Sequence, residues 1–227
     1  MARKKPAGRT PKNKSSRATG PAPSRGENSM GELRIIGGDW RSRKLRFPSA
    51  GGVRPTPART RETLFNWLSF HVEGSDCLDL FAGSGALGLE ALSRGAGNVT
   101  LVDHTPALAQ ALRANLQLLK SDKGDVVCAG VDAYLNHRTR APFDIVFMDP
   151  PFRQGWLERL FRALDEQGWV KPRGWVYVEH ESELATPVAP ASWQLHRQKT
   201  AGQVTYCLFR LQAEEQDNSL PELPDSE

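Results

Sequence analysis

The tetrapeptide Asp149-Pro150-Pro151-Phe152 places a carboxylate, two prolines and an aromatic ring directly after the apolar run 143–148. A carboxylate accepts hydrogen bonds from an amine, and an aromatic ring stacks on a flat base. Because proline has a fixed φ and no N–H, the turn is stiff and leaves nearby carbonyl groups free to accept hydrogen bonds. The pattern therefore predicts a site for a flat base with an exocyclic amine. Taken alone, it also fits a strand that ends in prolines, followed by a core phenylalanine.

A glycine loop, Gly83-Ser84-Gly85-Ala86-Leu87-Gly88, follows the apolar run 77–81 and precedes a predicted helix. Its glycines permit a tight turn and let the backbone approach a ligand closely, as in NAD enzymes and in methyltransferases. Asp103 lies at the end of the next predicted strand, where it can accept hydrogen bonds from ribose hydroxyls. The alternative role for Asp103 is to cap the following helix, a task for which Thr105 competes.

Two further carboxylates favour a cationic cofactor. Asp79 precedes the loop, where a dinucleotide would place its anionic pyrophosphate. S-adenosylmethionine carries a sulfonium and an ammonium group and no phosphate, so acids beside the loop suit it. Asp132 follows the third predicted strand and is expected either to accept a hydrogen bond from an adenine amine or to cap the helix 133–136.

Short β-rich runs alternate with amphipathic stretches from residue 76 onward, which predicts a mostly parallel α/β sheet with helices on both faces. Runs 194–199 and 204–211 leave no room for a helix between them, so the sheet should end in an antiparallel strand pair. The expected strands are 77–81, 99–102, 126–129, 143–148 and 175–179, and the expected helices are 86–94, 106–120 and one around 157–164.

Residues 30–72 are predicted to form a small extension, with a hairpin from strands 33–36 and 44–47 and a helix in which Thr56 is the N-cap and Pro57 the first residue. Residues 1–61 carry sixteen Lys or Arg and three acidic residues, a net charge of +13, which leaves −9 for the remainder. Such segregation is typical of a face that binds a polyanion, although residues 1–29 alone would equally fit a tail that only aids solubility. The basic residues expected to present this charge are Arg34, Arg41, Arg43, Lys44, Arg46, Arg54, Arg59 and Arg61.

The two ends of the chain lack the apolar residues that a core needs. Residues 1–29 contain eight basic residues and no Leu, Ile, Val, Phe, Tyr or Trp, and residues 213–227 contain six acidic residues and no basic one. We expect a disordered basic tail, 1–29, and a disordered acidic tail, 213–227, with the extension 30–72 and a single α/β domain, 73–212, between them.

Three cysteines, Cys77, Cys128 and Cys207, lie far apart without metal-ligand spacing, so we expect buried thiols, no disulfide and no metal site. No stretch resembles a signal peptide or approaches membrane-spanning length, which predicts a cytoplasmic protein without a membrane partner. A monomer is the default expectation, since nothing in the sequence fixes the oligomeric state.

Several motifs together resemble one family. Asp79-x-Phe81-x-Gly83-x-Gly85 and the tetrapeptide 149–152 resemble the class I methyltransferases that act on exocyclic amines. Further motifs along residues 34–211 are similar to the bacterial RsmD family, which methylates N2 of one guanine in 16S ribosomal RNA. These motifs are Arg34-Ile35-Ile36-Gly37-Gly38, Arg41-x-Arg43-Lys44-Leu45, Arg54-Pro55-Thr56-x-x-Arg59-x-Arg61-Glu62-x-Leu64-Phe65-Asn66 and Ala201-Gly202-Gln203-Val204-x-Tyr206.

The resemblance implies a Rossmann-like methyltransferase that uses S-adenosylmethionine and acts on 16S ribosomal RNA, in the small (30S) subunit or an assembly intermediate. It implies that Asp149 and the carbonyl group of Pro150 hold the target amine, while Phe152 stacks on the base. The implied cofactor-binding residues are Asp79, Phe81, Gly83, Ser84, Gly85, Asp103, Asp132 and Ala133, and the implied substrate-binding residues are Arg41, Arg43, Lys44, Arg54, Thr56, Arg59, Pro151 and Phe152. The family often has Glu where this chain has Asp103, and the basic tail lies outside the family's common core.

Three alternatives remain open from the residues alone. The Pro-Pro-aromatic motif does not choose the base, so an adenine-N6 methyltransferase on DNA or RNA is one alternative. The glycine loop keeps an NAD-dependent oxidoreductase open, and the basic N-terminal segment keeps a non-catalytic RNA-binding module open.

Overall fold

The computed structural model describes residues 30–49, 54–137 and 141–213. The two predicted tails, apart from residue 213, lie outside the described residues. The strands of the described chain are β1 (Met30–Arg34), β2 (Lys44–Pro48), β3 (Asp76–Asp79), β4 (Asn98–Asp103), β5 (Gly124–Cys128), β6 (Phe143–Met148), β7 (Val170–Glu181), β8 (Trp193–Ala201) and β9 (Val204–Leu211). The helices are α1 (Ala58–Trp67), α2 (Gly88–Ser93), α3 (Pro106–Leu119), α4 (Val131–Asn136) and α5 (Trp156–Glu166).

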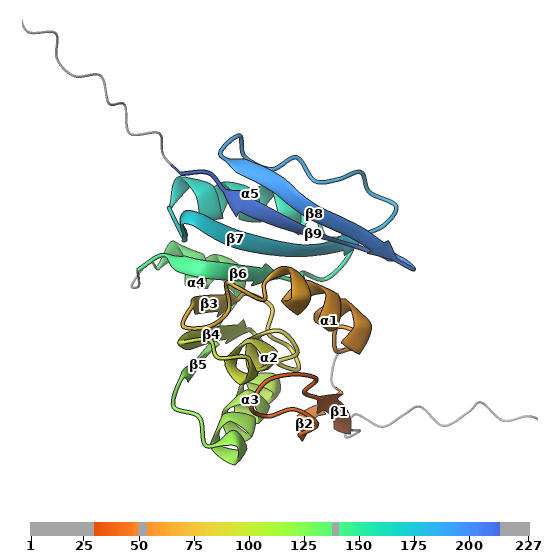
Figure 1. Ribbon diagram of the computed structural model, residues 1–227, viewed down its shortest axis with the longest axis vertical. Helices are drawn as coiled ribbons and strands as arrows, with labels where there is room; N and C mark the ends of the chain where they lie inside the picture. The colour runs from red at the N-terminus through yellow and green to blue at the C-terminus, as the bar shows by residue number, and fades with distance from the viewer. Residues whose placement is uncertain (1–29, 50–53, 138–140, 214–227) are drawn as a thin grey trace, which may run out of the picture.

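The central sheet has the strand order β5-β4-β3-β6-β7-β9-β8 (Figure 1). Strands β5, β4, β3, β6 and β7 are parallel to their neighbours, while β9 is antiparallel to β7 and to β8. The chain winds outward from β3 in one direction and from β6 in the other, so the switch point of the topology lies between these two strands. Ligands of open α/β sheets bind at such a point, outside the carboxyl ends of the strands.

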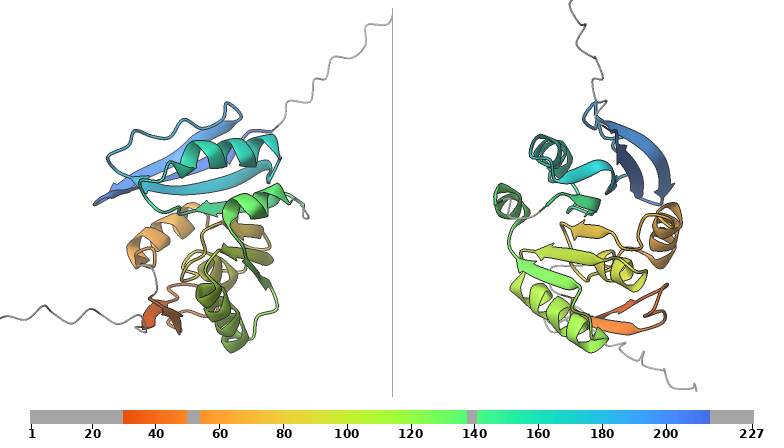
Figure 2. Two further views of the ribbon diagram at one scale, coloured as in Figure 1. Left: turned by 180° about the vertical axis from the view of Figure 1, so that it is seen from behind. Right: turned by 60° about the vertical axis from the view of Figure 1, so that its left-hand side comes forward.

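Helices cover both faces of the sheet (Figure 2). Helices α1, α2 and α3 share one buried apolar cluster with one face of the sheet, and α4 and α5 share a second cluster with the other face. Helix α3 shows why the pattern predicts this packing: Leu108, Leu112, Leu116 and Leu119 are buried at helical spacing. The expected fold class, including the C-terminal antiparallel pair, is confirmed.

A buried glutamate joins the N-terminal extension to the sheet domain. The carboxylate of Glu90 in α2 accepts hydrogen bonds from the backbone N–H of Ile36 at 2.9 Å and of Gly37 at 2.8 Å. It also pairs with Arg61 of α1 at 3.1 Å and with Arg94 at 2.8 Å. The prediction that Arg61 presents its charge outward is therefore wrong. Its guanidinium is buried, pairs with Glu90 and donates hydrogen bonds to two backbone carbonyl groups.

Some other expectations also need correction. Helix α1 begins at Ala58 with Pro57, not Thr56, as its N-cap. Cys128 is exposed, whereas Cys77 and Cys207 are buried, because Cys128 ends β5, an edge strand with a neighbour on one side only.

Candidate active site at the carboxyl ends of the strands

Four acidic side chains meet where the parallel strands end. Asp79 ends β3, Asp103 ends β4, Asp149 directly follows β6, and Glu179 lies near the end of β7. Asp79 pairs with Phe147 across the switch point, so the end of β3 lies beside the tetrapeptide 149–152. Sequence reasoning did not single out Glu179.

Asp79 is buried, and only one of its two carboxylate oxygens has a hydrogen-bond partner among the described residues. Its Oδ2 atom accepts a hydrogen bond from the backbone N–H of Gly88 at 3.0 Å, while its Oδ1 atom is buried without a partner among the described residues. Burial raises the pKa of Asp79 to about 7, since the charged form loses its hydration; the Gly88 N–H opposes this rise and nearby Asp149 adds to it. Such an oxygen is ready for a hydrogen-bond donor or a positive charge from a ligand.

Asp103 shapes the glycine loop directly. Its Oδ2 atom accepts the N–H of Gly83 at 2.8 Å and its Oδ1 atom accepts the N–H of Thr105 at 2.7 Å. Thr105 is the N-cap of α3 by position but makes no side-chain capping bond. The carboxylate is thus fixed beside the loop, and each oxygen keeps one further acceptor lone pair.

The loop itself requires glycine. Gly85 has φ +82°, and a Cβ there would lie 2.6 Å from the side chain of Leu89 and 2.7 Å from that of Leu112. Ser84 is buried in the same turn, and the ring of Phe81 packs edge-on against Trp156, with centroids 5.3 Å apart. A side chain at position 85 would therefore clash with the buried leucines of α2 and α3, so this turn needs glycine.

Asp149 is held by a residue of the N-terminal extension. The hydroxyl of Thr56 donates a hydrogen bond to the Oδ2 atom of Asp149 at 3.4 Å. Burial raises the pKa of Asp149 to about 6, and the Thr56 hydroxyl works against this rise. Thr56 is itself buried.

Glu179 lies next to Asp149 in the sheet. The pairing of Met148 with Val178 brings the following residue of each parallel strand, Asp149 and Glu179, side by side. The phenol of Tyr177 donates a hydrogen bond to the Oε1 atom of Glu179 at 2.8 Å. Burial, followed by the charge of Asp149, raises the pKa of Glu179 well above its ordinary range.

A cavity of about 170 Å³ lies beside the tetrapeptide. Its lining includes Pro150, Pro151, Phe152, Trp156 and Glu179. It is smaller than the pockets of roughly 300–1,000 Å³ that enclose drug-sized ligands. The ring of Phe152 is partly exposed, and the backbone N–H of Arg153 donates to the carboxylate of Glu181, which ties the loop to β7.

Asp132 and Ala133 are exposed in the first turn of α4. Asp132 does not cap this helix, since its N-cap is Gly130; its carboxylate pairs with Arg159 at 3.4 Å. Asp103 pairs with Cys128 at the end of β5, so the turn into α4 reaches the same edge of the sheet as Asp103.

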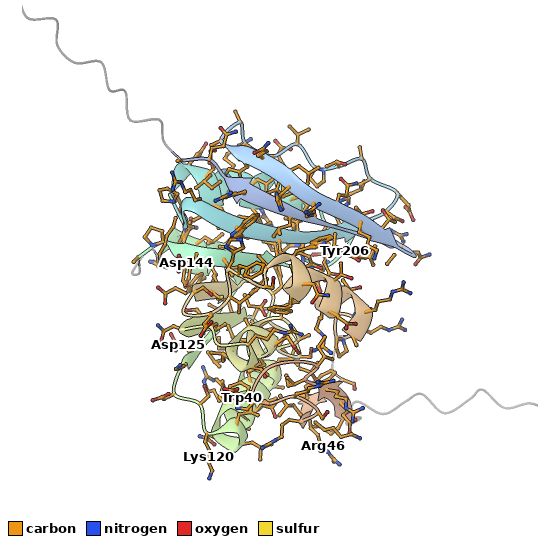
Figure 3. All side chains as sticks on the ribbon, in the orientation of Figure 1. Trp40, Arg46, Lys120, Asp125, Asp144 and Tyr206 are labelled. Carbon is orange, nitrogen blue, oxygen red and sulfur yellow. The ribbon has the colours of Figure 1, made fainter. Side chains whose placement is uncertain are left out.

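The expected RNA-contacting side chains lie on the hairpin and near α1. Lys44 pairs with Glu32 at 3.0 Å and Arg43 donates to the carbonyl group of Leu118 at 3.3 Å, both at exposed positions. In Figure 3, Tyr206 of β9 lies near α1, whereas Asp144 lies at the start of β6, at the other end of the strands. Residues Arg41, Arg43, Lys44, Arg54, Arg59, Pro151 and Phe152 are all exposed, and only Thr56 among the implied substrate-binding residues is buried.

The site fits a cationic cofactor without phosphate. None of the ion pairs of the described chain involves Asp79, Asp149 or Glu179, so these buried carboxylates lack a basic partner there. A sulfonium or ammonium group would supply the missing positive charge, whereas a pyrophosphate would add repulsion.

The described residues contain neither a metal-binding cluster nor a helix that could span a membrane. No group of three or more His, Cys, Asp or Glu side chains in 30–49, 54–137 and 141–213 is arranged to hold a metal ion. No helix of the described chain is long and apolar enough to cross a membrane.

The strand order, the glycine loop after β3 and the acid after β4 define a class I methyltransferase with a Rossmann-like fold. The family described as "Conserved hypothetical protein 95" matches residues 33–210. The chain belongs to this family, which is the RsmD family that the sequence motifs resemble.

Relatives of known name support the family. Ribosomal RNA small subunit methyltransferase D of Escherichia coli is 48% identical over 187 residues, which cover 82% of this chain and 94% of the relative. The Haemophilus influenzae protein of the same name is 44% identical over 186 residues, covering 81% and 96%. A solved E. coli structure, described as a candidate methyltransferase, has a TM-score of 0.76 and 49% identity, and covers 81% of this chain and 100% of that chain.

Proposed function

We propose that this protein transfers a methyl group from S-adenosylmethionine to the exocyclic N2 amine of a guanine in 16S ribosomal RNA. The observation that carries the proposal is the position of Asp149 and Pro150 at the switch point, beside the loop and the half-satisfied Asp79. The names of the E. coli and H. influenzae relatives support small-subunit ribosomal RNA as the substrate. The proposal includes a monomeric cytoplasmic enzyme that needs no metal and acts on the small subunit or an assembly intermediate.

The amine of guanine needs help to react, because its lone pair is delocalised into the ring. The carboxylate of Asp149 and the carbonyl oxygen of Pro150 would accept hydrogen bonds from its two N–H groups and favour a pyramidal nitrogen. Positioning of this kind can supply effective molarities of roughly 10⁵ M or more. Asp149 would also take the proton that the nitrogen loses, since its pKa of about 6 suits a proton acceptor near neutral pH.

The cofactor, when bound, supplies an electrophilic methyl group on a sulfonium. Asp79 would hold the ammonium group through its unpartnered Oδ1 atom. Asp103 would accept hydrogen bonds from the ribose, and Asp132 from the adenine amine. Backbone groups of residues 83–85 would line the rest of the site, with Phe81 and Ala133 at its sides.

The target base must leave its stack to reach the cavity, which costs a few kcal/mol and least where the base is unpaired. Phe152 would offset part of this cost by stacking on the base. The exposed basic residues of the hairpin and of the α1 region would hold the RNA backbone through phosphate contacts. Thr56 is better placed to orient Asp149 than to touch the RNA.

The proposal is tested by transfer of labelled methyl groups from S-adenosylmethionine to 30S particles and to naked 16S RNA. We expect transfer by the wild type to at least one substrate, and a loss of about 100-fold or more in Asp149→Asn, because the carboxamide offers one acceptor and cannot take the proton. Asp122→Asn, at an exposed position remote from the strand ends, is the matched control and should leave the rate unchanged. Absence of transfer by the wild type to both substrates would refute the proposal, and NADH binding without S-adenosylmethionine binding would favour an oxidoreductase.

A further inference from the structure

Glu179 is a buried carboxylate at the candidate site to which the proposed reaction assigns no task. Only 4% of its surface is exposed, yet it lines the cavity that Pro150 and Phe152 also line. A carboxylate is rarely buried to this extent without a cation to pair with it.

The groups that face Glu179 come from several elements. Asp149 lies beside it at the end of β6, and Tyr206 lies opposite it in the antiparallel pairing of β7 with β9. Tyr177 donates to its Oε1 atom, and Thr56 and Asp79 lie near enough to influence its charge. These neighbours include two further carboxylates and no Lys or Arg.

Two adjacent carboxylates form a pair of hydrogen-bond acceptors with few donors. The Thr56 hydroxyl donates to Asp149 and the Tyr177 hydroxyl donates to Glu179. Each carboxylate has about four lone-pair sites, so most of the acceptor capacity remains open. Glu179 lines the cavity and Asp149 lies directly beside Glu179, so a ligand that brings two adjacent N–H donors to this end of the strands would match the pair.

The Watson–Crick edge of guanine offers such donors, because its ring N1–H lies next to its N2 amine. Adenine presents an N6 amine next to N1, which has no hydrogen and is an acceptor. An acceptor at Glu179 would therefore accept N1–H of guanine and repel N1 of adenine.

We propose that Glu179 is the specificity residue of this site, which accepts the ring N1–H of the target guanine while Asp149 accepts its N2–H. This inference rests on the proposed function and deepens it, because it names the contact that selects guanine over adenine. Burial and the neighbouring Asp149 raise the pKa of Glu179, so its ionised form is unfavourable in the ligand-free protein and would be stabilised by an N–H donor such as N1–H of guanine.

The test pairs an atomic change in the base with a change in the side chain. 16S RNA is assembled by ligation with guanine or with 2,6-diaminopurine at the position that the wild type methylates. Diaminopurine keeps the 2-amine but has an acceptor at N1. The variant is Glu179→Gln. Its carboxamide oxygen can still accept a hydrogen bond from Tyr177, and its NH₂ group can donate one to N1 of diaminopurine.

We expect the wild type to prefer guanine over diaminopurine by about 100-fold in kcat/KM, since a buried acceptor facing an acceptor leaves both unpaired. In Glu179→Gln this preference should shrink by at least tenfold. The change at the 6-position of the base is the same for both proteins and cancels in the comparison. Glu183→Gln is the matched control, because it makes the same substitution at an exposed position in the loop that follows β7, and should keep the wild-type preference.

Three outcomes separate the claims. A preference that is equal in wild type and Glu179→Gln overturns the role of Glu179, while methylation of guanine by the wild type keeps the proposed function. Equal rates of the wild type on both bases also overturn it, and this measurement needs no variant to fold. No methylation of the guanine substrate by the wild type refutes the proposed function itself.

Discussion

At the scale of single residues, the site is built from carboxylates that the fold keeps away from water. Asp79 has one bonded and one unpartnered oxygen, and Asp149 and Glu179 lie side by side without a basic partner among the described residues. Such groups make the ligand-free protein less stable than it would be with apolar residues, and they gain when a cation or an N–H donor arrives. The buried carboxylates therefore lower the stability of the ligand-free protein and favour the binding of a cationic or N–H-donating ligand.

The destabilising effect of buried Asp79 should depend on pH. Its pKa is about 7 in the folded protein against 3.8 for an ordinary aspartate, so between these values the folded protein holds a proton that the unfolded chain has lost. The contribution of Asp79 to stability is thus present at pH 4 and is lost as the pH rises through 7. We expect Asp79→Asn to stabilise the ligand-free protein at pH 8 by a few kcal/mol relative to its effect at pH 4, and to weaken S-adenosylmethionine binding. Urea unfolding at both pH values and calorimetric titration check this; an equal effect at the two pH values would contradict it.

Asp149 should control the pH dependence of the reaction. Because burial raises its pKa to about 6, the ionised acceptor is lost as the pH falls through 6. We expect the single-turnover methylation rate to fall about tenfold per pH unit below that value. A rate that stays constant down to pH 5, in protein shown to remain folded, would show that Asp149 is not the titrating acceptor.

At the scale of elements, the N-terminal extension is attached through Glu90. This carboxylate is fully buried and binds two backbone N–H groups of the extension, Arg61 of α1 and Arg94. The attachment places Thr56, just before α1, against Asp149. The segment expected to hold RNA is thus coupled to the residue expected to hold the amine.

The Glu90→Gln variant measures how much this attachment contributes to the free energy of unfolding. Removing one partner of a buried ion pair costs about 3 kcal/mol, because Arg61 is left in the interior without its counter-charge. Glu158→Gln is the matched control: Glu158 pairs with Arg162 at the same i,i+4 spacing as Glu90 with Arg94, but on the surface, so its loss should cost less than about 0.5 kcal/mol. Denaturant unfolding of both variants measures the difference, and equal costs would contradict the role given to Glu90.

Much of the fold followed from periodicity. The alternation of strands and helices, the glycine loop and the absence of a helix between β8 and β9 are local features, so the sequence could predict them. The roles of Glu90, Arg61 and Glu179 depend on partners far away in the chain, and charged residues are exposed by default. Thr56 beside Asp149 and the exposure of Cys128 likewise depend on which strands are neighbours, which no local pattern encodes.

At the scale of the whole molecule, charge is divided between an N-terminal part of +13 and a remainder of −9. The hairpin and α1 that carry part of the positive charge attach to the sheet domain, with α1 beside Tyr206 near the ends of β6 and β7 (Figure 3). RNA drawn to the basic surface would have the cavity within reach, while the acidic remainder discourages binding elsewhere.

Residues 1–29 add eight of the basic residues. We expect deletion of this segment to weaken RNA affinity and to flatten its salt dependence, because each lost phosphate contact reduces the number of counterions released. S-adenosylmethionine binding should not change. Filter binding at several salt concentrations tests this, and an unchanged slope would contradict it.

The most direct test of the central claim is the identity of the modified nucleoside. 16S RNA that lacks the modification is incubated with S-adenosylmethionine and either wild type or Asp149→Asn, digested to nucleosides and analysed by mass spectrometry. We expect N2-methylguanosine with the wild type and almost none with Asp149→Asn. N6-methyladenosine, or no methylated nucleoside with the wild type, would contradict the account.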